Sequence, residues 1–182
     1  MKIVRTLKIG DEKGFSLNEI IITVALFGIL VGIGFYSYQS ISDRMNVEKN
    51  MKELYVDLMS ARIRAMQRSR THFVLFTAAP TQYAIYEDTD PEPDGDSALD
   101  TTKDALLMRK NLGWKFTVAY PAAWSSAPTA LQFSSRGLLD TAVTSTGTFR
   151  VTEELNGEYD CIIISEMKNN LGKWDGTHCQ AK

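Results

Sequence analysis

Hydrophobic positions along the chain fall into two patterns, one unbroken and one periodic. Between residues 20 and 36 no side chain is charged, and Thr23 is the only polar one apart from the hydroxyl of Tyr36. A helix over residues 15–38 would rise about 1.5 Å per residue and cross a hydrocarbon core of roughly 30 Å. The unbroken pattern therefore predicts a membrane-spanning helix near the N-terminus.

The periodic pattern begins after Ser42. Apolar residues then recur at alternating spacings of four and three, which places them on one face of a helix. We expect the first helix to continue to about Arg68 and to pack this apolar stripe on a sheet. The stripe consists of Val47, Met51, Leu54, Leu58, Ala61 and Ala65, and the charged residues Lys49, Glu53, Asp57 and Arg64 fall on the other side.

From residue 71 onward the sequence predicts β-structure, because short runs rich in β-branched and aromatic residues alternate with turn signals. The predicted strands are 71–77, 82–87, 105–109, 115–120, 130–133, 148–152 and 159–165. The turns are placed at Pro80-Thr81, Pro121, Pro128, Arg136-Gly137 and Asn156-Gly157. The expected fold class is α+β, with a long N-terminal helix packed on an antiparallel β-sheet head.

The expected organisation has four parts within one domain-sized chain of 182 residues. They are a basic leader (1–14), a transmembrane half of the helix (15–40), an amphipathic half (41–70) and a β-rich globular head (71–182). The leader carries four basic and two acidic side chains, which favours a cytoplasmic N-terminus with the bulk of the chain outside. A secretory signal peptide would end in small residues, but the apolar run ends in Tyr-Ser-Tyr-Gln and continues into the periodic pattern.

Charge and cysteine content limit the possible partners and compartments. The formal net charge is −2, and without the leader 16 basic and 20 acidic side chains remain, so no bulk preference for nucleic acid is indicated. The two cysteines, Cys161 and Cys179, both lie on the predicted exported side. An even count in an oxidising compartment predicts one disulfide, with two free thiols as the alternative.

Residues 14–19, which read GFSLNE, join the leader to the apolar run. This junction resembles the processing site of type IV prepilins and type II secretion pseudopilins. The resemblance implies that a prepilin peptidase cuts between Gly14 and Phe15 and that the new amino group of Phe15 is methylated. It also implies the type IV pilin fold. Asn18 departs from the aliphatic residue usual in the family, whereas the cleavage and acidic positions match.

Glu19 is an acidic residue at the start of the apolar run. An ionisable side chain inside a membrane costs a few kcal/mol at the least and usually has a partner. The resemblance implies that Glu19 pairs with the N-terminal amine of a neighbouring subunit during assembly. The alternative is a carboxylate that extends to the cytoplasmic interface.

Two stretches of the head, 59–76 and 131–151, resemble the GspH/FimT branch of minor pilins. The resemblance implies a structural minor pilin or pseudopilin without enzyme activity, placed at or near the tip of a type IV pilus or type II secretion pseudopilus. The implied partners are the prepilin peptidase, other pilins or pseudopilins, the inner-membrane assembly platform and, before assembly, lipid. The precursor would be a single-pass inner-membrane protein with a periplasmic head. A major pilin of the filament shaft is an alternative.

Two charged segments suggest other functions. Arg62, Arg64, Arg68 and Arg70 could contact DNA, as in a minor pilin for DNA uptake, but helix-terminal arginines that favour the helix dipole are a simpler account. Residues 87–104 carry eight acidic side chains, and residues 90–95 within them, which read DPEPDG, resemble the start of a calcium loop. Thr101 stands where such a loop needs a bidentate glutamate, so we expect a solvated loop. No metal site, cofactor or catalytic motif is predicted.

Overall fold

The computed structural model describes residues 14–77, 81–92, 95–119, 130–139, 147–152 and 157–182. Contacts between residues divide the chain into two units, one that ends at Ser40 and one that begins at Ile41. One helix, α1 (Leu17–Arg68), contributes residues to both units. All the strands belong to the second unit, which we call the head together with the part of α1 from Ile41.

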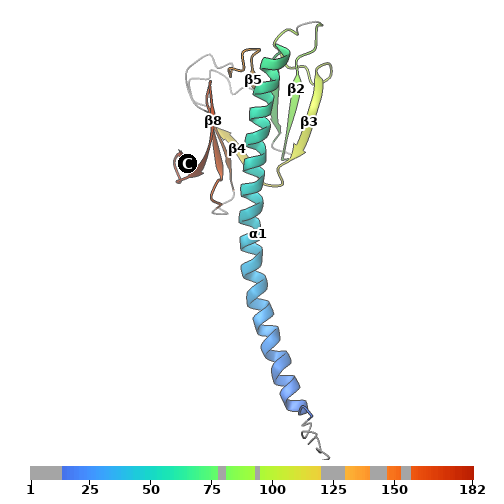
Figure 1. Ribbon diagram of the computed structural model, residues 1–182, viewed down its shortest axis with the longest axis vertical. Helices are drawn as coiled ribbons and strands as arrows, with labels where there is room; N and C mark the ends of the chain where they lie inside the picture. Colours follow the sequence, from blue (N-terminus) through green and yellow to red (C-terminus); the bar gives the residue numbers. More distant parts are fainter. Residues whose placement is uncertain (1–13, 78–80, 93–94, 120–129, 140–146, 153–156) are drawn as a thin grey trace, which may run out of the picture. The chain divides into compact units, whose positions relative to one another are not determined.

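The strands of the head form two antiparallel sheets, which lie on either side of the α1 segment that belongs to the same unit (Figure 1). The first sheet has the order β3-β2-β1-β5 and contains β1 (His72–Thr77), β2 (Gln82–Glu87), β3 (Ala105–Asn111) and β5 (Ala130–Phe133). The second has the order β4-β6-β7-β8-β9 and contains β4 (Phe116–Ala119), β6 (Gly147–Val151), β7 (Cys161–Ile164), β8 (Asn169–Trp174) and β9 (Cys179–Ala181). The predicted α+β fold with an antiparallel head is confirmed.

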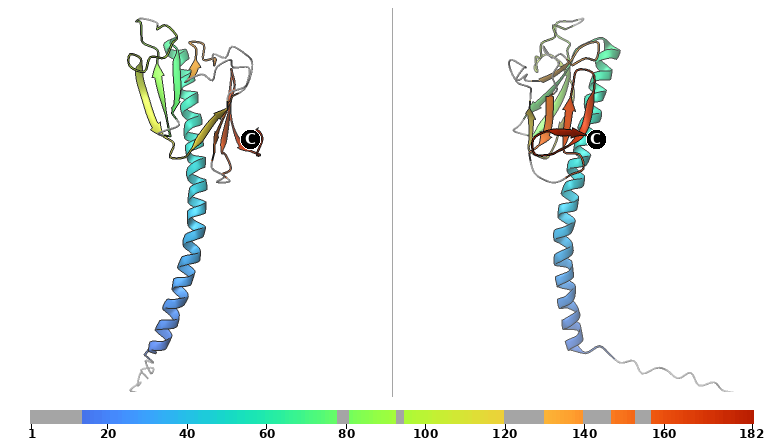
Figure 2. Two further views of the ribbon diagram at one scale, coloured as in Figure 1. Left: turned by 180° about the vertical axis from the view of Figure 1, so that it is seen from behind. Right: turned by 90° about the vertical axis from the view of Figure 1, so that its left-hand side faces the viewer.

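Each of the seven predicted strands overlaps an observed strand, and two observed strands were not predicted. The unpredicted strands are β8 and β9, which complete one edge of the second sheet (Figure 2). The predicted turn at Arg136-Gly137 is present, with the N–H of Gly137 donating to the carbonyl of Ser134 (2.7 Å). Pro80, Tyr120, Pro121, Pro128 and Asn156, which belong to other predicted turns and to one strand end, lie outside the described residues.

The core of the head is built around the predicted stripe of α1. All six residues of that stripe are at most 1% exposed, so the periodic pattern is confirmed residue by residue. Apolar residues from both sheets pack against the stripe: Val74, Tyr83, Ile85, Leu131 and Phe133 from the first, and Phe149, Ile162 and Ile164 from the second. Because one stripe supplies the core for two sheets, α1 is the element that holds the head together.

An aromatic cluster joins the two sheets directly. The ring of Phe76 in β1 lies 5.2 Å from the ring of Phe149 in β6, measured between centroids. The ring of Phe116 in β4 lies 5.0 Å from Phe149 and 5.9 Å from Phe76. Such pairs contribute about 0.5–1.5 kcal/mol each beyond the area they bury. The sheets therefore contact each other as well as the helix.

Asp57 does not lie on the exposed side of α1, where the charge pattern placed it. Its side chain is buried and accepts a hydrogen bond from the hydroxyl of Tyr83 in β2 and another from Lys110 in β3 (2.7 Å). Lys110 also contacts Glu53 (2.7 Å). Burial lowers the pKa of Lys110, but the hydrogen bonds that Lys110 donates to Asp57 and Glu53 outweigh this effect and raise the pKa overall. A partly buried polar network therefore connects α1 with the first sheet.

Replacing Tyr83 with phenylalanine is expected to lower the free energy of unfolding by about 1–2 kcal/mol, because it removes one buried donor to Asp57 without changing the shape of the side chain. Thermal unfolding of the full chain in detergent micelles would measure this loss. Tyr55→Phe is the matched control, since Tyr55 is half-buried and its hydroxyl has no hydrogen bond among the described residues. Equal melting temperatures for the two variants would show that the network does not stabilise the fold.

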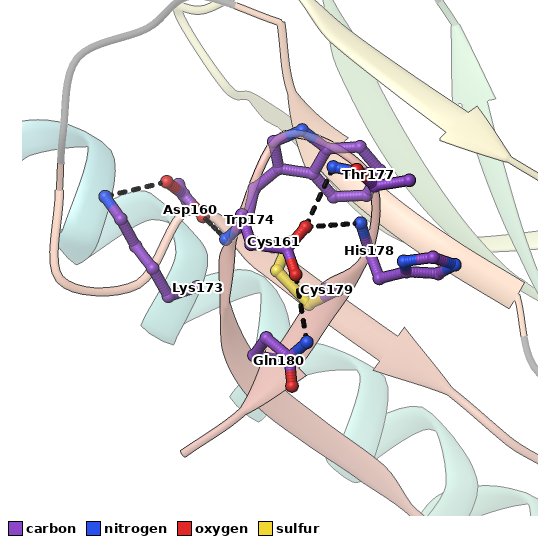
Figure 3. The surroundings of a disulfide bond; sticks show 9 residues. Asp160, Cys161, Lys173, Trp174, Thr177, His178, Cys179 and Gln180 are labelled. Atoms are coloured by element: carbon purple, nitrogen blue, oxygen red, sulfur yellow. Dashed lines mark hydrogen bonds and ion pairs between the residues drawn. A yellow bond between two sulfur atoms is a disulfide. The ribbon is translucent and has the colours of Figure 1, made fainter.

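Cys161 and Cys179 form a disulfide that connects β7 with β9 (Figure 3). These strands are not neighbours, because β8 lies between them. The bond passes over Gly172 of β8, where an added Cβ would approach the sulfur of Cys179 to 2.7 Å and the carbonyl oxygen of Gln180 to 2.5 Å. A glycine at this strand position is therefore required by the close approach of the Gln180 carbonyl and of the sulfur.

Other contacts also hold the C-terminal segment (Figure 3). The carboxylate of Asp160 accepts the N–H of Trp174 (2.6 Å) and pairs with Lys173 (3.1 Å). In the turn before β9, Asp175 accepts hydrogen bonds from the N–H of His178 (2.7 Å) and from the side chain of Gln180 (2.9 Å), and these lower the pKa of its carboxyl to about 2. The C-terminal segment is therefore held by these contacts as well as by the disulfide.

Replacing both cysteines with serine is expected to lower the melting temperature by roughly 6–12 °C. The bond closes a loop with a sequence separation of 18, which is worth about 3 kcal/mol in the chain-entropy model. Because strand pairing remains, β8 and β9 should fold at low temperature but become protease-sensitive before the rest of the head. Wild-type protein with reductant is the control and should behave like the double variant. Two reactive thiols in denatured, non-reduced protein would contradict the bond.

Candidate functional site

The predicted processing site lies where the described chain begins. Gly14 and Phe15 precede the helix, and Phe15 is 80% exposed. In the first turn of α1, the N–H of Glu19 donates a hydrogen bond to the carbonyl of Ser16 (3.0 Å). A peptidase needs an accessible, non-helical peptide, and the bond between Gly14 and Phe15 meets this requirement here.

Glu19 lies in the first turn of α1, where a negative charge interacts favourably with the helix dipole. Its side chain is exposed, and among the described residues no basic group of the same chain lies within ion-pair distance. A cationic partner for this carboxylate would therefore have to come from residues outside the described ranges, from the amine that cleavage creates, or from another subunit.

The apolar part of α1 is, by length and composition, long and apolar enough to span a membrane. Its most apolar 18-residue window has a mean hydropathy of 2.3, and none of that window is buried within the chain. The large apolar side chains along it are mostly more than half exposed, such as Phe27 at 69% and Val31 at 65%. An apolar surface of this length without intramolecular cover requires lipid or other protein chains around it.

The arginine cluster of the sequence does not form one basic surface. Arg62 is buried in the head, and Arg68 and Arg70 both pair with the buried carboxylate of Glu87, at 2.8 and 3.7 Å. Only Arg64 of the four is exposed without an ion pair among the described residues. Three of the four side chains that a DNA-binding surface would need are therefore either buried or paired with Glu87.

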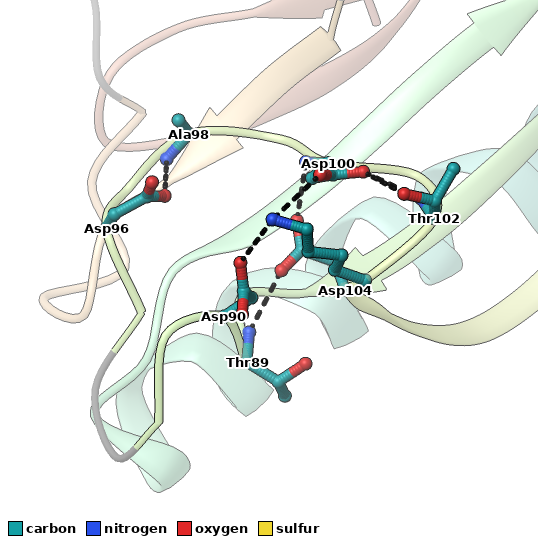
Figure 4. A network of polar contacts seen from close by, with 8 residues as sticks. Thr89, Asp90, Asp96, Ala98, Asp100, Thr102 and Asp104 are labelled. Atoms are coloured by element: carbon teal, nitrogen blue, oxygen red, sulfur yellow. Dashed lines mark hydrogen bonds and ion pairs between the residues drawn. The ribbon is translucent and has the colours of Figure 1, made fainter.

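The acidic loop that follows β2 is organised by its own carboxylates (Figure 4). Asp104 accepts hydrogen bonds from the N–H of Thr89 (3.1 Å) and the N–H of Asp100 (2.8 Å), and Lys103 pairs with Asp90 (3.2 Å). Over the ranges that the structure describes, no three His, Cys, Asp or Glu side chains are grouped to hold a metal ion.

Asp88 is the buried carboxylate of this loop. One oxygen accepts the N–H of Ser97 (2.7 Å), and the other has no partner among the described residues. Gly95 packs on the carboxylate so closely that an added Cβ would overlap it. Burial raises the pKa of Asp88, and the nearby charge of Asp104 adds to this effect. A raised carboxyl pKa means that this group stabilises the fold below its unfolded pKa and loses that contribution as the pH rises through its folded pKa.

Replacing Asp88 with asparagine is therefore expected to stabilise the head, by on the order of 1 kcal/mol at pH 7, because an uncompensated buried charge is removed. The gain should shrink as the pH falls to 3.8, the unperturbed pKa of this carboxyl. Melting temperatures across this pH range measure the effect. Asp96→Asn is the matched control, since Asp96 is exposed in the same loop. A destabilised Asp88→Asn variant at pH 7 would mean that the carboxylate has a partner.

Together, a long N-terminal helix with an apolar, uncovered half and a head of antiparallel sheets define the class of protein with the type IV pilin fold. The family described as type II transport protein GspH matches residues 50–167, and the chain belongs to this family. No curated protein and no solved structure matches the chain significantly. Membership supports a pseudopilin or minor pilin role in type II secretion, in a family whose members are structural rather than catalytic.

The turn that follows β5 shows why the head of this chain needs a particular glycine. Gly137 has a φ of 73°, and an added Cβ would approach the side chain of Met66 in α1 to 2.7 Å. After the turn, the N–H of Leu139 donates to the carbonyl of Glu166 (3.1 Å), which follows β7. Within the matched region, this turn therefore connects the helix with both sheets.

Proposed function

We propose that the chain is a structural minor pseudopilin of a type II secretion system, made as a membrane-anchored precursor and assembled at or near the tip of the pseudopilus. The observation that carries the proposal is the GFSLNE junction, which lies in accessible chain next to a helix that is apolar and uncovered. The family match supports the secretion role, and the junction supports the processing.

Processing would begin in the membrane. The basic leader would keep the N-terminus in the cytoplasm and the head in the periplasm, by the preference of positive flanks for the cytoplasmic side. The prepilin peptidase would cut between Gly14 and Phe15, and the amine of Phe15 would be methylated. The disulfide fits a periplasmic head, because such bonds persist in oxidising compartments.

Assembly would use the new N-terminus. The amine of Phe15 would pair with the carboxylate of Glu19 of a neighbouring subunit, since an ionisable group in apolar surroundings needs an opposite charge. The exposed apolar side chains of α1 would then exchange lipid for the helices of other pseudopilins at the inner-membrane assembly platform.

Deletion and quantification test the proposal. Deleting the gene should reduce export of type II substrates and leave type IV pili intact, and the wild-type gene should restore export. In sheared filaments the chain should be far less abundant than the major subunit. Unchanged secretion with loss of pili would place the chain in a pilus, and equal abundance with the major subunit would exclude a tip position.

A further inference from the structure

The head exposes large apolar side chains mainly on one side of α1. Among its described residues seven such side chains are exposed, and five of them belong to α1. These five are Ile41 (54%), Met45 (65%), Val56 (57%), Ile63 (48%) and Met66 (47%). With 3.6 residues per turn, all five project from the helix within a sector of about 80°. We call these five residues, together with the half-buried Met59 in the same sector, the outer flank of α1.

The outer flank is separate from the stripe that packs on the sheets. Between the two, on the remaining side of α1, the exposed residues are polar. They are Asn46, Lys49, Glu53, Arg64 and Gln67. The head part of α1 therefore has two apolar faces, of which one is covered by the sheets and the other is exposed. Because the covered face already attaches the helix to its own head, the exposed face is available to another molecule.

The shape of the outer flank fits a helix. Val56, Met59, Ile63 and Met66 follow one another at spacings of three, four and three, and the flank is one side chain wide over about 38 Å. A narrow stripe with this spacing is typical of the contact between two helices packed lengthwise. Between Met45 and Val56 the same sector contains Glu48 and Lys52, which pair with each other (2.5 Å). Lipid is a poor cover for a stripe that charges interrupt, whereas polar positions in a helix contact fix its register.

The turn between β7 and β8 adds to this surface near Met66. Arg62, one helical turn before Met66, donates hydrogen bonds to the carbonyls of Met167 and Ser165 (3.1 Å to the latter) and so holds the turn beside α1. The side chain of Met167 is 75% exposed. Methionine side chains are flexible and polarizable, so they adapt to the surface of a partner.

We propose that the outer flank binds the N-terminal helix of one neighbouring pilin-like subunit, packed lengthwise against the head part of α1. The inference rests on the proposed function, which supplies such subunits, and adds a contact outside the membrane. The flank begins at Ile41, directly after the apolar half of the same helix, which also needs other chains or lipid around it. The apolar side chains would lose their contact with water, and Glu48 and Lys52 would set the register.

Photo-crosslinking in cells that make the whole assembly system tests this partner. A photoreactive phenylalanine analogue in place of Val56 or Ile63 should cross-link to the N-terminal helix of one other subunit, which peptide mass spectrometry identifies. The same analogue in place of Lys49 or Arg64, on the polar side of α1, is the control and should give no such product. Cross-links only to lipid, only to a second copy of this chain, or only to non-helical residues of another protein would each overturn the proposal.

The double variant Val56→Glu/Ile63→Glu tests the contact by its energy. Both residues are exposed, so the full chain in detergent micelles should melt within about 2 °C of wild type. Recovery of the cross-link partner with the tagged chain should fall at least about tenfold, because two charges would be buried without opposite charges. Asn46→Asp/Gln67→Glu adds the same charge on the polar side and should retain the partner. Equal recovery with both double variants would overturn the proposal, and so would a large loss of melting temperature in the first, since the flank would then be structural.

The outcome for the outer flank is distinguishable from the outcome for the proposed function. If deletion of the gene removed pili and left export intact, while Val56 and Ile63 positions cross-linked to the helix of a pilin, the secretion role would be wrong and the helix contact right. If deletion reduced export but neither position cross-linked to another subunit, the helix contact alone would be overturned.

Discussion

Replacing Gly14 with valine is expected to abolish processing, so that the full-length precursor accumulates in the membrane. The head should still fold, because an added Cβ at Gly14 meets no atom within 4 Å and the residue precedes α1. The loss would therefore arise at the peptidase, which would have to accommodate a branched side chain next to the bond it cuts. Mass spectrometry of the membrane-extracted protein would distinguish a chain that begins at Met1 from one that begins at Phe15.

Gly10→Val, within the same leader, is the matched control and should be processed normally. In wild-type pseudopili the chain should begin at Phe15 and carry one methyl group on its amine. A mature wild-type chain that retains Met1, or a Gly14→Val chain that still begins at Phe15, would contradict the proposed cleavage site.

Replacing Glu19 with alanine is expected to exclude the chain from filaments while leaving it inserted and folded. The substitution removes an ionisable group from an apolar segment, so insertion should become easier rather than harder. The amine of the neighbouring subunit would lose its counter-charge, and filament incorporation should fall to background. Immunoblots of sheared filaments and of the membrane fraction measure the two pools.

Asp43→Ala is the control for this experiment, since Asp43 is an acidic residue of the same helix beyond the apolar run. It should enter filaments normally. The melting temperature of the head should be the same for both variants, which separates an assembly defect from misfolding. Normal incorporation of Glu19→Ala would show that the carboxylate is interfacial.

The sequence predicted the core-facing side of α1 correctly because helical periodicity fixes which residues share a face. All six stripe residues are buried, from Val47 to Ala65. Periodicity does not show which hydrogen-bond partners a neighbouring segment places beside that face. Asp57 and Arg62 lie beside the stripe, and each is buried because a distant segment supplies its partners: Tyr83 for one and the β7–β8 turn for the other.

Strands β8 and β9 were not predicted because their residues lack the usual strand signals. The sequence of β8 is NNLGKW, with neither alternation nor β-branched residues. This strand exists because β7 and β9 pair with it on both sides. One available signal was overlooked: Gly172 within a segment that precedes a cysteine indicates close approach of another group to the backbone.

The arginine cluster is a feature that the sequence suggests but that the structure does not contain as one surface. Four arginines within nine residues suggest a single basic surface. However, α1 ends at Arg68 and the chain reverses, so the four side chains do not form one surface. Two of them, Arg68 and Arg70, form ion pairs with Glu87 at the end of β2. Which charges remain available to a partner is decided by these long-range pairs, and charge density along the chain does not reveal them.

The disulfide between β7 and β9 has a consequence for proteolytic damage. A single cut anywhere between Cys161 and Cys179 leaves the two fragments covalently joined, with β9 still attached to β7 across β8. A nick in the exposed turn at Asp175–His178 would therefore release no peptide. Damaged and intact chains would migrate together under non-reducing electrophoresis and separate only after reduction, so the chain can tolerate such a cut without losing its last strand.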